Sequence, residues 1–156
     1  MLVAEAVVVR AYESGDDAFI ARLAHDAFDE FTPRAVPHTL GMVKRFRTLV
    51  AMRGGRRVGF ITLSGQDDDV FVVQAIAVSS RERGRGVGHQ LMHAFESLAI
   101  THGARRLELC TADCNLAALD LFFKRGFYIL RRRERFYERG QAACILVKDL
   151  RKTLAP

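Results

Sequence analysis

Glycine and arginine alternate in the segment RERGRGVGHQ, residues 81–90. An apolar run, VFVVQAIAV at 70–78, precedes this segment, and a helical pattern, VGHQLMHAFESLAI at 87–100, follows it. The N-terminus of a helix presents unpaired backbone N–H groups and a partial positive charge, which together attract phosphate. Glycine has no Cβ atom to keep a phosphate away from the backbone, and arginine adds charge-assisted hydrogen bonds. The pattern therefore predicts a pyrophosphate-binding turn between a strand and a helix.

Other designs also place glycines at such a turn. A P-loop needs G-x-x-x-x-G-K-[ST], and no Lys-Ser/Thr pair follows these glycines. A dinucleotide-binding fingerprint needs G-x-G-x-x-G and normally opens a doubly wound sheet, whereas the spacing here is G-x-G-x-G and several strands precede it. One alternative that stays open is a tight turn whose glycines serve only packing. For His89, the alternative is that it simply belongs to a polar helix face. The predicted phosphate contacts are Arg83, Gly84, Arg85, Gly86, Val87, Gly88 and His89.

The composition is that of an ordinary globular protein. The chain has 156 residues, of which 49% are hydrophobic and 27% charged, so we expect one domain over 1–156 with a substantial core. No apolar run approaches the roughly 20 residues of a membrane helix, and the N-terminus lacks a signal-peptide pattern. Three cysteines without paired spacing favour a cytoplasmic location without a disulfide framework, and Cys110 and Cys114 do not predict a metal site.

The formal net charge is +6, which favours an anionic partner such as a phosphate-bearing cofactor. The run RRRER at 131–135 raises nucleic acid as an alternative partner, but a solvent-exposed strand face explains it as well. We therefore do not expect nucleic acid to be the main partner.

The hydrophobic pattern alternates between strand and helix periods along the chain. It predicts a mixed α/β sheet of about six to seven mostly antiparallel strands, with a central parallel pair from a strand–helix–strand unit and about four helices on both faces. A turn is expected at QDDD, 66–69, and a strand hairpin around Gly54-Gly55. The expected strands are 6–12, the two arms of 48–65, 70–78, 105–111, 127–137 and 142–150, and the expected helices are 14–28, 38–47, 86–102 and 115–125.

Two segments carry a resemblance to a known family. RGRGVG at 83–88, after IAV at 76–78, resembles motif A of the GNAT N-acetyltransferases, R/Q-x-x-G-x-G/A. NLAALDLFFKRGF at 115–127 resembles the family segment N-x-x-A-x-x-L-Y-x-x-x-GF, and the resemblance extends over about 6–150. It implies the GNAT fold, acetyl-CoA as cosubstrate and direct transfer of an acetyl group to an amine.

The resemblance also implies roles for particular residues. The cofactor's pantetheine arm would pair with the backbone of the strand edge at Ile76, Ala77 and Val78. Asn115 would cap its helix, contact the cofactor, or do both. Phe122 would pack against the pantetheine arm.

Glu108 is the predicted general base, acting through water. Leu107 and Leu109 flank it, so strand alternation places its side chain on the face opposite to theirs. A solvent-facing glutamate is the alternative, and Asp67–Asp69 are rival bases near the cleft mouth. Many family members carry a glutamate at the place of Val72 or Gln74, and neither residue is acidic here.

The family usually has a tyrosine four residues before the glycine of its GF pair, and this sequence has Phe122 there. Phenylalanine cannot protonate the leaving thiolate. We expect water to do so, with Tyr137 as the best alternative in the protein and loss of catalysis as the third outcome. Cys114 is not expected to be a nucleophile, because no histidine is near it in sequence.

The C-terminal part resembles the branch that acetylates protein N-termini, which includes the ribosomal-protein alanine acetyltransferases. The features that carry this narrower resemblance are LELCTADCN at 107–115 and the pair Phe136-Tyr137. The acceptor is expected between the loop at 28–37 and Tyr137, and a peptide N-terminus is favoured because no dense acidic patch is present. A small-molecule amine and a CoA-binding module without catalysis are the alternatives, and a homodimer is left open.

Overall fold

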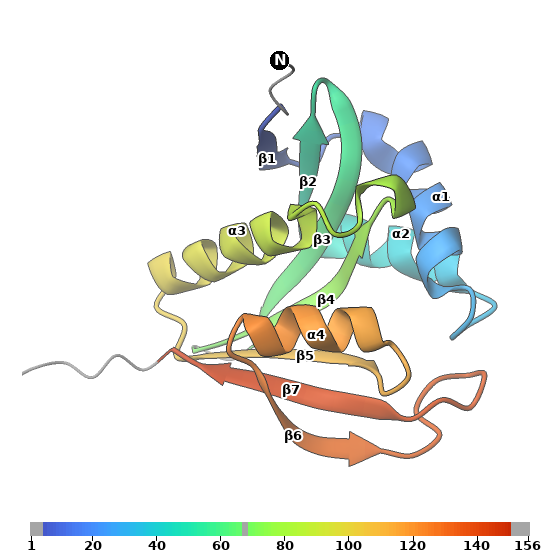
Figure 1. The fold of residues 1–156 in the computed structure, drawn as a ribbon, viewed down its shortest axis with the longest axis vertical. Helices are drawn as coiled ribbons and strands as arrows, with labels where there is room; N and C mark the ends of the chain where they lie inside the picture. Colours follow the sequence, from blue (N-terminus) through green and yellow to red (C-terminus); the bar gives the residue numbers. More distant parts are fainter. Residues whose placement is uncertain (1–4, 67–68, 151–156) are drawn as a thin grey trace, which may run out of the picture.

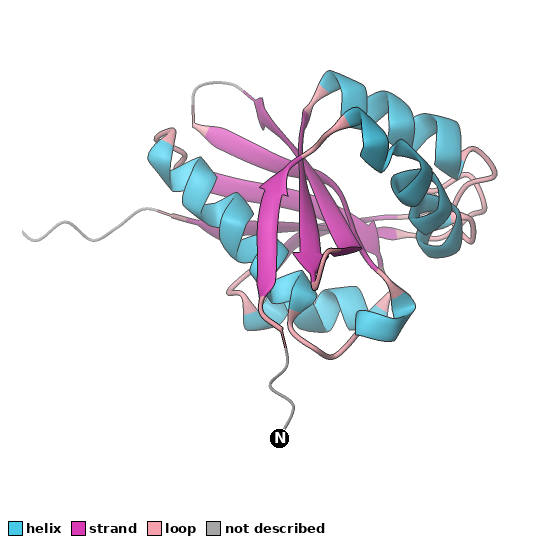
Figure 2. Cartoon of the chain, turned by 90° about the horizontal axis from the view of Figure 1, so that it is seen from above, coloured by secondary structure: helices cyan, strands magenta, loops and turns pink. Residues whose placement is uncertain are grey.

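The computed structural model describes residues 5–66 and 69–150, which form one seven-stranded sheet with helices on both faces (Figures 1 and 2). The strands are β1 Val7–Ala11, β2 Arg47–Arg53, β3 Arg56–Gln66, β4 Val70–Val78, β5 Arg106–Ala112, β6 Tyr128–Arg133 and β7 Ala143–Asp149. The helices are α1 Asp17–Phe28, α2 Ala35–Arg45, α3 Val87–Thr101 and α4 Leu116–Lys124, with short 3₁₀ turns at Ser14–Asp16 and Ser80–Glu82.

The sheet order is β1-β2-β3-β4-β5-β7-β6. Every neighbouring pair is antiparallel except β4 and β5, which are parallel. This arrangement confirms the predicted mixed sheet with a central parallel pair. Residues 67–68 of the expected QDDD turn lie outside the described residues.

Two clusters of buried side chains hold the helices against the sheet. On one face, Phe95 of α3 and Phe122 of α4 pack with Leu107 and Leu109 of β5. On the other face, residues of α1 and α2 pack with β2, β3 and β4; Ile20 and Val43 are examples. Burial of this kind is the main source of stability in a domain of this size.

Two element boundaries differ from the expectation. The second helix begins at Ala35 rather than near 38, because Pro37 lies in its first turn, where a missing N–H costs nothing. The expected strand 127–137 ends at Arg133, since Arg135 has a positive φ of 49° and the N–H groups of Phe136 and Tyr137 both donate to the carbonyl of Gln141. Tyr137 therefore lies in the β6–β7 loop.

The first three arginines of the run, Arg131–Arg133, lie on the edge strand β6, all of whose residues are exposed. Arg132 pairs with Asp113 and with Glu134. No helix within residues 5–66 and 69–150 is long and apolar enough to cross a membrane.

Candidate active site

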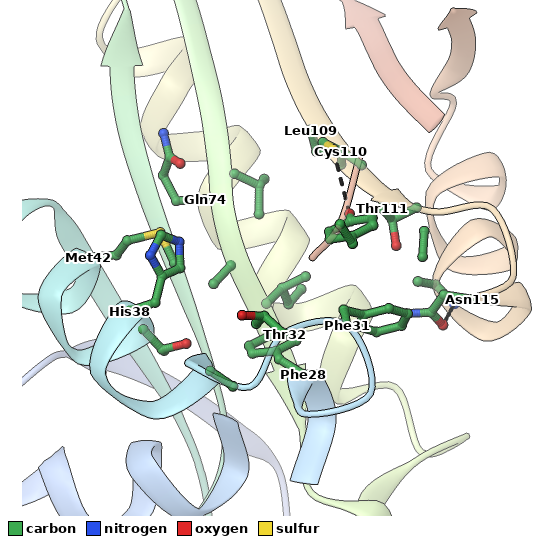
Figure 3. A pocket seen from close by; sticks show the side chains of 18 of the residues that line it. Phe28, Phe31, Thr32, His38, Met42, Gln74, Leu109, Cys110, Thr111 and Asn115 are labelled. Atoms are coloured by element: carbon green, nitrogen blue, oxygen red, sulfur yellow. Dashed lines mark hydrogen bonds between the residues drawn. The ribbon is translucent and has the colours of Figure 1, made fainter. Parts of the chain in front are cut away.

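The two parallel strands diverge at the centre of the sheet. β4 and β5 pair only where Val70–Val72 lies opposite Arg106–Glu108. Beyond this point β4 continues to Val78 with a partner on one side, β3, so the backbone along its other edge has no ladder partner. A cavity of about 760 Å³ occupies the gap, lined by both strands, by α2 and α4, and by two loops (Figure 3).

The glycine loop follows β4 directly and leads into α3. Gly84 and Gly86 have positive φ angles of 74° and 85°, and Gly86 is the N-cap of α3. A Cβ atom added at either glycine would meet no heavy atom within 4 Å, so the space above the backbone is open. The first N–H groups of α3 have no carbonyl one turn earlier. The geometry fits the predicted phosphate-binding turn.

The side chains of this loop have unequal surroundings. Arg83 is exposed, whereas Arg85 pairs with Glu82, its Nη1 lying 3.2 Å from Oε2. Val87 is buried in the core, so only its backbone can face a ligand. A Cβ at Gly88 would lie 3.0 Å from Leu121 of α4, so this glycine also permits close helix packing. His89 is half-buried in the first turn of α3.

The β4 and α4 residues predicted to bind the cofactor lie at the same gap. Ile76 lines the cavity, and Ala77 and Val78 continue the strand toward the glycine loop, paired with β3. Asn115 caps α4 by accepting a hydrogen bond from the N–H of Ala118 at 3.2 Å, and it lines the cavity as well. Phe122 also lines the cavity and is only 2% exposed, with its ring centroid 6.1 Å from that of Phe127.

Tyr137 enters the cavity from the β6–β7 loop. Its hydroxyl lies 3.6 Å from the Sγ of Cys110, and its ring packs against Phe31 and Phe136 with centroid distances of 5.3 and 5.0 Å. Burial raises the pKa of Tyr137 well above its ordinary value near 10, and it also raises the pKa of the Cys110 thiol. Both groups therefore keep their protons at physiological pH and can donate hydrogen bonds.

Glu108 lies at the point where β4 and β5 part. It is half-buried, opposite Val72 and Val147, while its neighbours Leu107 and Leu109 are buried in the core on the other face. The predicted alternation is confirmed. Leu109 lines the cavity and Glu108 does not, so the predicted base lies outside the cavity wall.

Among the cavity residues that the sequence analysis did not predict, Gln74 and His38 carry polar side chains that could contact an acceptor. Gln74 is the extra residue of a bulge in β4, where Thr62 pairs with Ala75 but the next residue, Leu63, pairs with Val73. Its Nε2 donates to the Oγ of Ser64 at 2.8 Å. His38 of α2 lies on the same side of the cavity (Figure 3). A bulge leaves no mark in hydrophobic alternation, and an isolated helical histidine has no spacing signal.

The α1–α2 loop and the β6–β7 loop are joined by a set of polar bonds that we call the clasp. Glu138 accepts hydrogen bonds from Arg34 at 2.9 Å and from Thr32 at 3.1 Å. Arg139 donates through its Nε to the carbonyl of Asp29 at 2.6 Å, and Gln141 donates to the carbonyl of Glu30 at 2.7 Å. The clasp therefore joins the two loops beside the cavity, and three of its residues, Thr32, Arg34 and Glu138, line the cavity.

The clasp also neutralises the carboxylate that lines the cavity. Glu138 is the one carboxylate among the described residues that line the cavity. The hydrogen bond from Arg34 lowers its pKa, so it is ionised at neutral pH and already neutralised by that arginine. The cavity thus offers no free anionic cluster to a polycation.

Comparison with known proteins gives one family. Residues 10–127 match the family model described as Acetyltransferase (GNAT) family. The chain is 34% identical over 119 residues to L-2,4-diaminobutyric acid acetyltransferase of Nocardia farcinica, a match that covers 74% of this chain and 61% of that protein. The chain thus spans less than two thirds of the length of this curated relative.

Solved structures share the fold. The ribosomal-protein-alanine N-acetyltransferase from Brucella melitensis has a TM-score of 0.79 at 18% identity, covering 92% of this chain and 99% of that one. YncA from Salmonella typhimurium, solved with its cofactor acetyl-CoA, has a TM-score of 0.79 at 16% identity, covering 97% and 98%. At these identities the likeness shows the fold alone.

Proposed function

We propose that this chain, which belongs to the acetyltransferase (GNAT) family, is an acetyl-CoA-dependent acetyltransferase that acetylates a primary amine bound in the cavity between β4 and β5. The observation that carries this proposal is the cavity itself. Its lining brings together the edge of β4 that has no partner, the start of α4, Tyr137, Gln74 and residues of the clasp. A donor and an acceptor can therefore meet between the diverging strands.

The residues present fit CoA. The open space above Gly84 and Gly86 lets a pyrophosphate approach the backbone, and the N–H groups at the start of α3 would hold it. The edge of β4 at Ile76–Val78 would hydrogen-bond the pantetheine arm. When bound, acetyl-CoA supplies the acetyl group as a thioester.

Glu108 is our candidate for removing the proton of the acceptor ammonium. An alkyl ammonium has a pKa of about 10, so at neutral pH it must lose a proton before it can attack. Because Glu108 does not line the cavity but lies at the last paired position of β4 and β5, it would act through a water molecule.

Tyr137 is our candidate for a hydrogen-bond donor at the reacting end of the cavity. A thiol has a pKa of about 8–9. The pKa of Tyr137 is raised far above this, so transfer of its proton to a thiolate would be uphill. Tyr137 would therefore orient its partners and keep its proton, and water would protonate the leaving thiolate.

A small-molecule amine is the acceptor class that the cavity favours. We infer that the clasp, which joins the two loops beside the cavity, would leave little room for a peptide chain behind its N-terminus. The named relative is a diaminobutyrate acetyltransferase, which acts on a small amine. We therefore place an amino-acid-sized amine first and the peptide N-terminus of the ribosomal-protein branch second.

An acceptor screen tests the function. Thiol release from acetyl-CoA would be measured with L-2,4-diaminobutyrate, other amino acids, polyamines, aminoglycosides, and peptides with free N-terminal alanine or serine. We expect release with a small amino-acid-type amine. Release with the peptides alone would put the peptide acceptor first, and CoA binding without release on any amine would identify a binding module.

A further inference from the structure

A buried carboxylate lies directly beneath the glycine loop. Glu82 ends the 3₁₀ turn that precedes the loop, and its side chain is only 5% exposed. Its Oε1 accepts from Nε of Arg53, at the end of β2, at 2.9 Å, and its Oε2 accepts from Nη1 of Arg85 at 3.2 Å. Arg53 also donates through Nη2 to the backbone carbonyl of Arg85 at 3.4 Å. Glu82 thus holds the side chain of Arg85, and Arg53 holds its backbone carbonyl.

The loop backbone alternates between engaged and free N–H groups. The N–H of Arg83 donates to Ser80 and that of Arg85 to Glu82, both within the turn. Among the backbone bonds of the described residues, the N–H groups of Gly84 and Gly86 donate none. In a planar trans peptide the N–H points opposite to the preceding carbonyl. Since the Arg85 carbonyl is turned toward Arg53, the N–H of Gly86 is turned away from Arg53.

We propose that Glu82 is a positioning residue of the cofactor site, which acts with Arg53 to hold Arg85 so that the loop N–H groups face the CoA pyrophosphate. The proposal rests on the assignment of the 83–88 loop to CoA. Without this anchor, the two left-handed glycines on either side of Arg85 would let the loop sample many conformations, and the cost of ordering it would weaken binding.

Electrostatics alone gives the opposite expectation. Glu82, Arg53 and Arg85 together carry a net charge of +1, and a carboxylate near a pyrophosphate repels it. Glu82→Gln would raise the charge of the cluster to +2. If charge were all that mattered, the variant would bind CoA more tightly. A positioning role predicts weaker binding, so the sign of the change separates the two.

Glu96 provides a matched control. It is a second buried glutamate, with 9% exposure, and it pairs with Arg125 at 2.8 Å and Lys148 at 2.6 Å. It lies in α3 away from the loop and does not line the cavity. Glu96→Gln removes the same charge and should lower stability in the same way.

The experiment is calorimetric titration of CoA into the wild type, Glu82→Gln and Glu96→Gln, with thermal unfolding measured alongside. We expect Glu82→Gln to weaken CoA binding by about tenfold or more, as for the loss of a charged hydrogen bond, and Glu96→Gln to leave it within about twofold. Unchanged or tighter binding in Glu82→Gln would overturn the proposal. If Glu82→Gln does not fold, Arg53→Lys keeps the charge but loses the forked contact, and unchanged CoA affinity in that folded variant would overturn it equally.

A further variant separates this proposal from the site assignment. Arg83→Glu reverses an exposed charge on the loop itself. If CoA binds but Arg83→Glu does not weaken it, the loop is not the CoA site. If Arg83→Glu weakens binding and Glu82→Gln does not, the loop assignment stands and only the positioning role fails.

Discussion

The proposed active site has two halves, one at the edge of the cavity and one inside it, which would recognise their ligands by different means. The cofactor half is built from backbone: the open edge of β4, the left-handed glycines and the start of α3. The acceptor half is built from side chains, with Phe31 and Tyr137 in ring contact and Gln74 bonded to Ser64. Backbone groups are present whatever the side chains are, so the first half tolerates substitution except where a side chain would block it. In the second half, substitution of any single residue can change which acceptor is recognised.

The largest expected effect concerns the proposed base, which would serve the acceptor half from outside the cavity wall. Glu108→Gln keeps the shape of the side chain and removes a base, so kcat should fall by about 10²–10⁴-fold at neutral pH. The loss should shrink as the pH rises toward the pKa of the acceptor amine, because the amine then loses its proton without help. A pH–rate profile for wild type and variant checks both points. If Glu108→Gln showed the wild-type kcat at neutral pH, another group would have to accept the proton of the amine. His38 is then the next candidate in the cavity.

The second prediction tests the cofactor half. Gly86→Val places a branched side chain in the open space above the loop, so we expect CoA affinity to fall by about 10–100-fold, through lost backbone contacts. Gly103, after the other end of α3, has a similar φ of 81° and similar open space, so Gly103→Val carries the same backbone strain. Calorimetry measures the CoA affinity of both folded variants. Because both carry the same backbone strain, a difference between their affinities reports on the glycine loop. Equal CoA affinities would show that the loop does not bind the cofactor.

The two halves also differ in how far they could be predicted from the sequence. The strand at 70–78, the glycine turn and the capped helix at 115 are local features, and each was found because its signal lies within about 15 residues of chain. The acceptor half joins residues near 30, 74, 110 and 137, which meet only after the sheet has formed. Its bulge at Gln74 and its clasp depend on pairing register and loop contacts, which hydrophobic periodicity does not encode.

The third prediction concerns the acceptor half. Tyr137→Phe removes a hydroxyl that keeps its proton, so the acceptor KM should rise by about threefold to tenfold, as for one neutral hydrogen bond, while kcat changes little. Because the pKa of Tyr137 is raised, wild type and variant should also share one pH profile up to about pH 10. Steady-state kinetics across pH measure both. A large loss of kcat at unchanged KM would instead make Tyr137 the acid. Tyr128→Phe on the exposed strand β6 serves as the control.

The smallest expected effect is at Phe122, where the cofactor half lacks the hydroxyl that the family usually provides. The ring is buried, so a hydroxyl added by Phe122→Tyr must find a partner in the cavity or cost about 1–3 kcal/mol of folding stability. CoA affinity should stay within about twofold, since the ring that packs against the arm is kept. If water already protonates the thiolate, a new donor has little to add, and kcat should rise by less than about threefold. A rise of tenfold or more would show that proton delivery limits the wild-type enzyme. It would then follow that the phenylalanine, rather than the deprotonation of the amine, sets its rate.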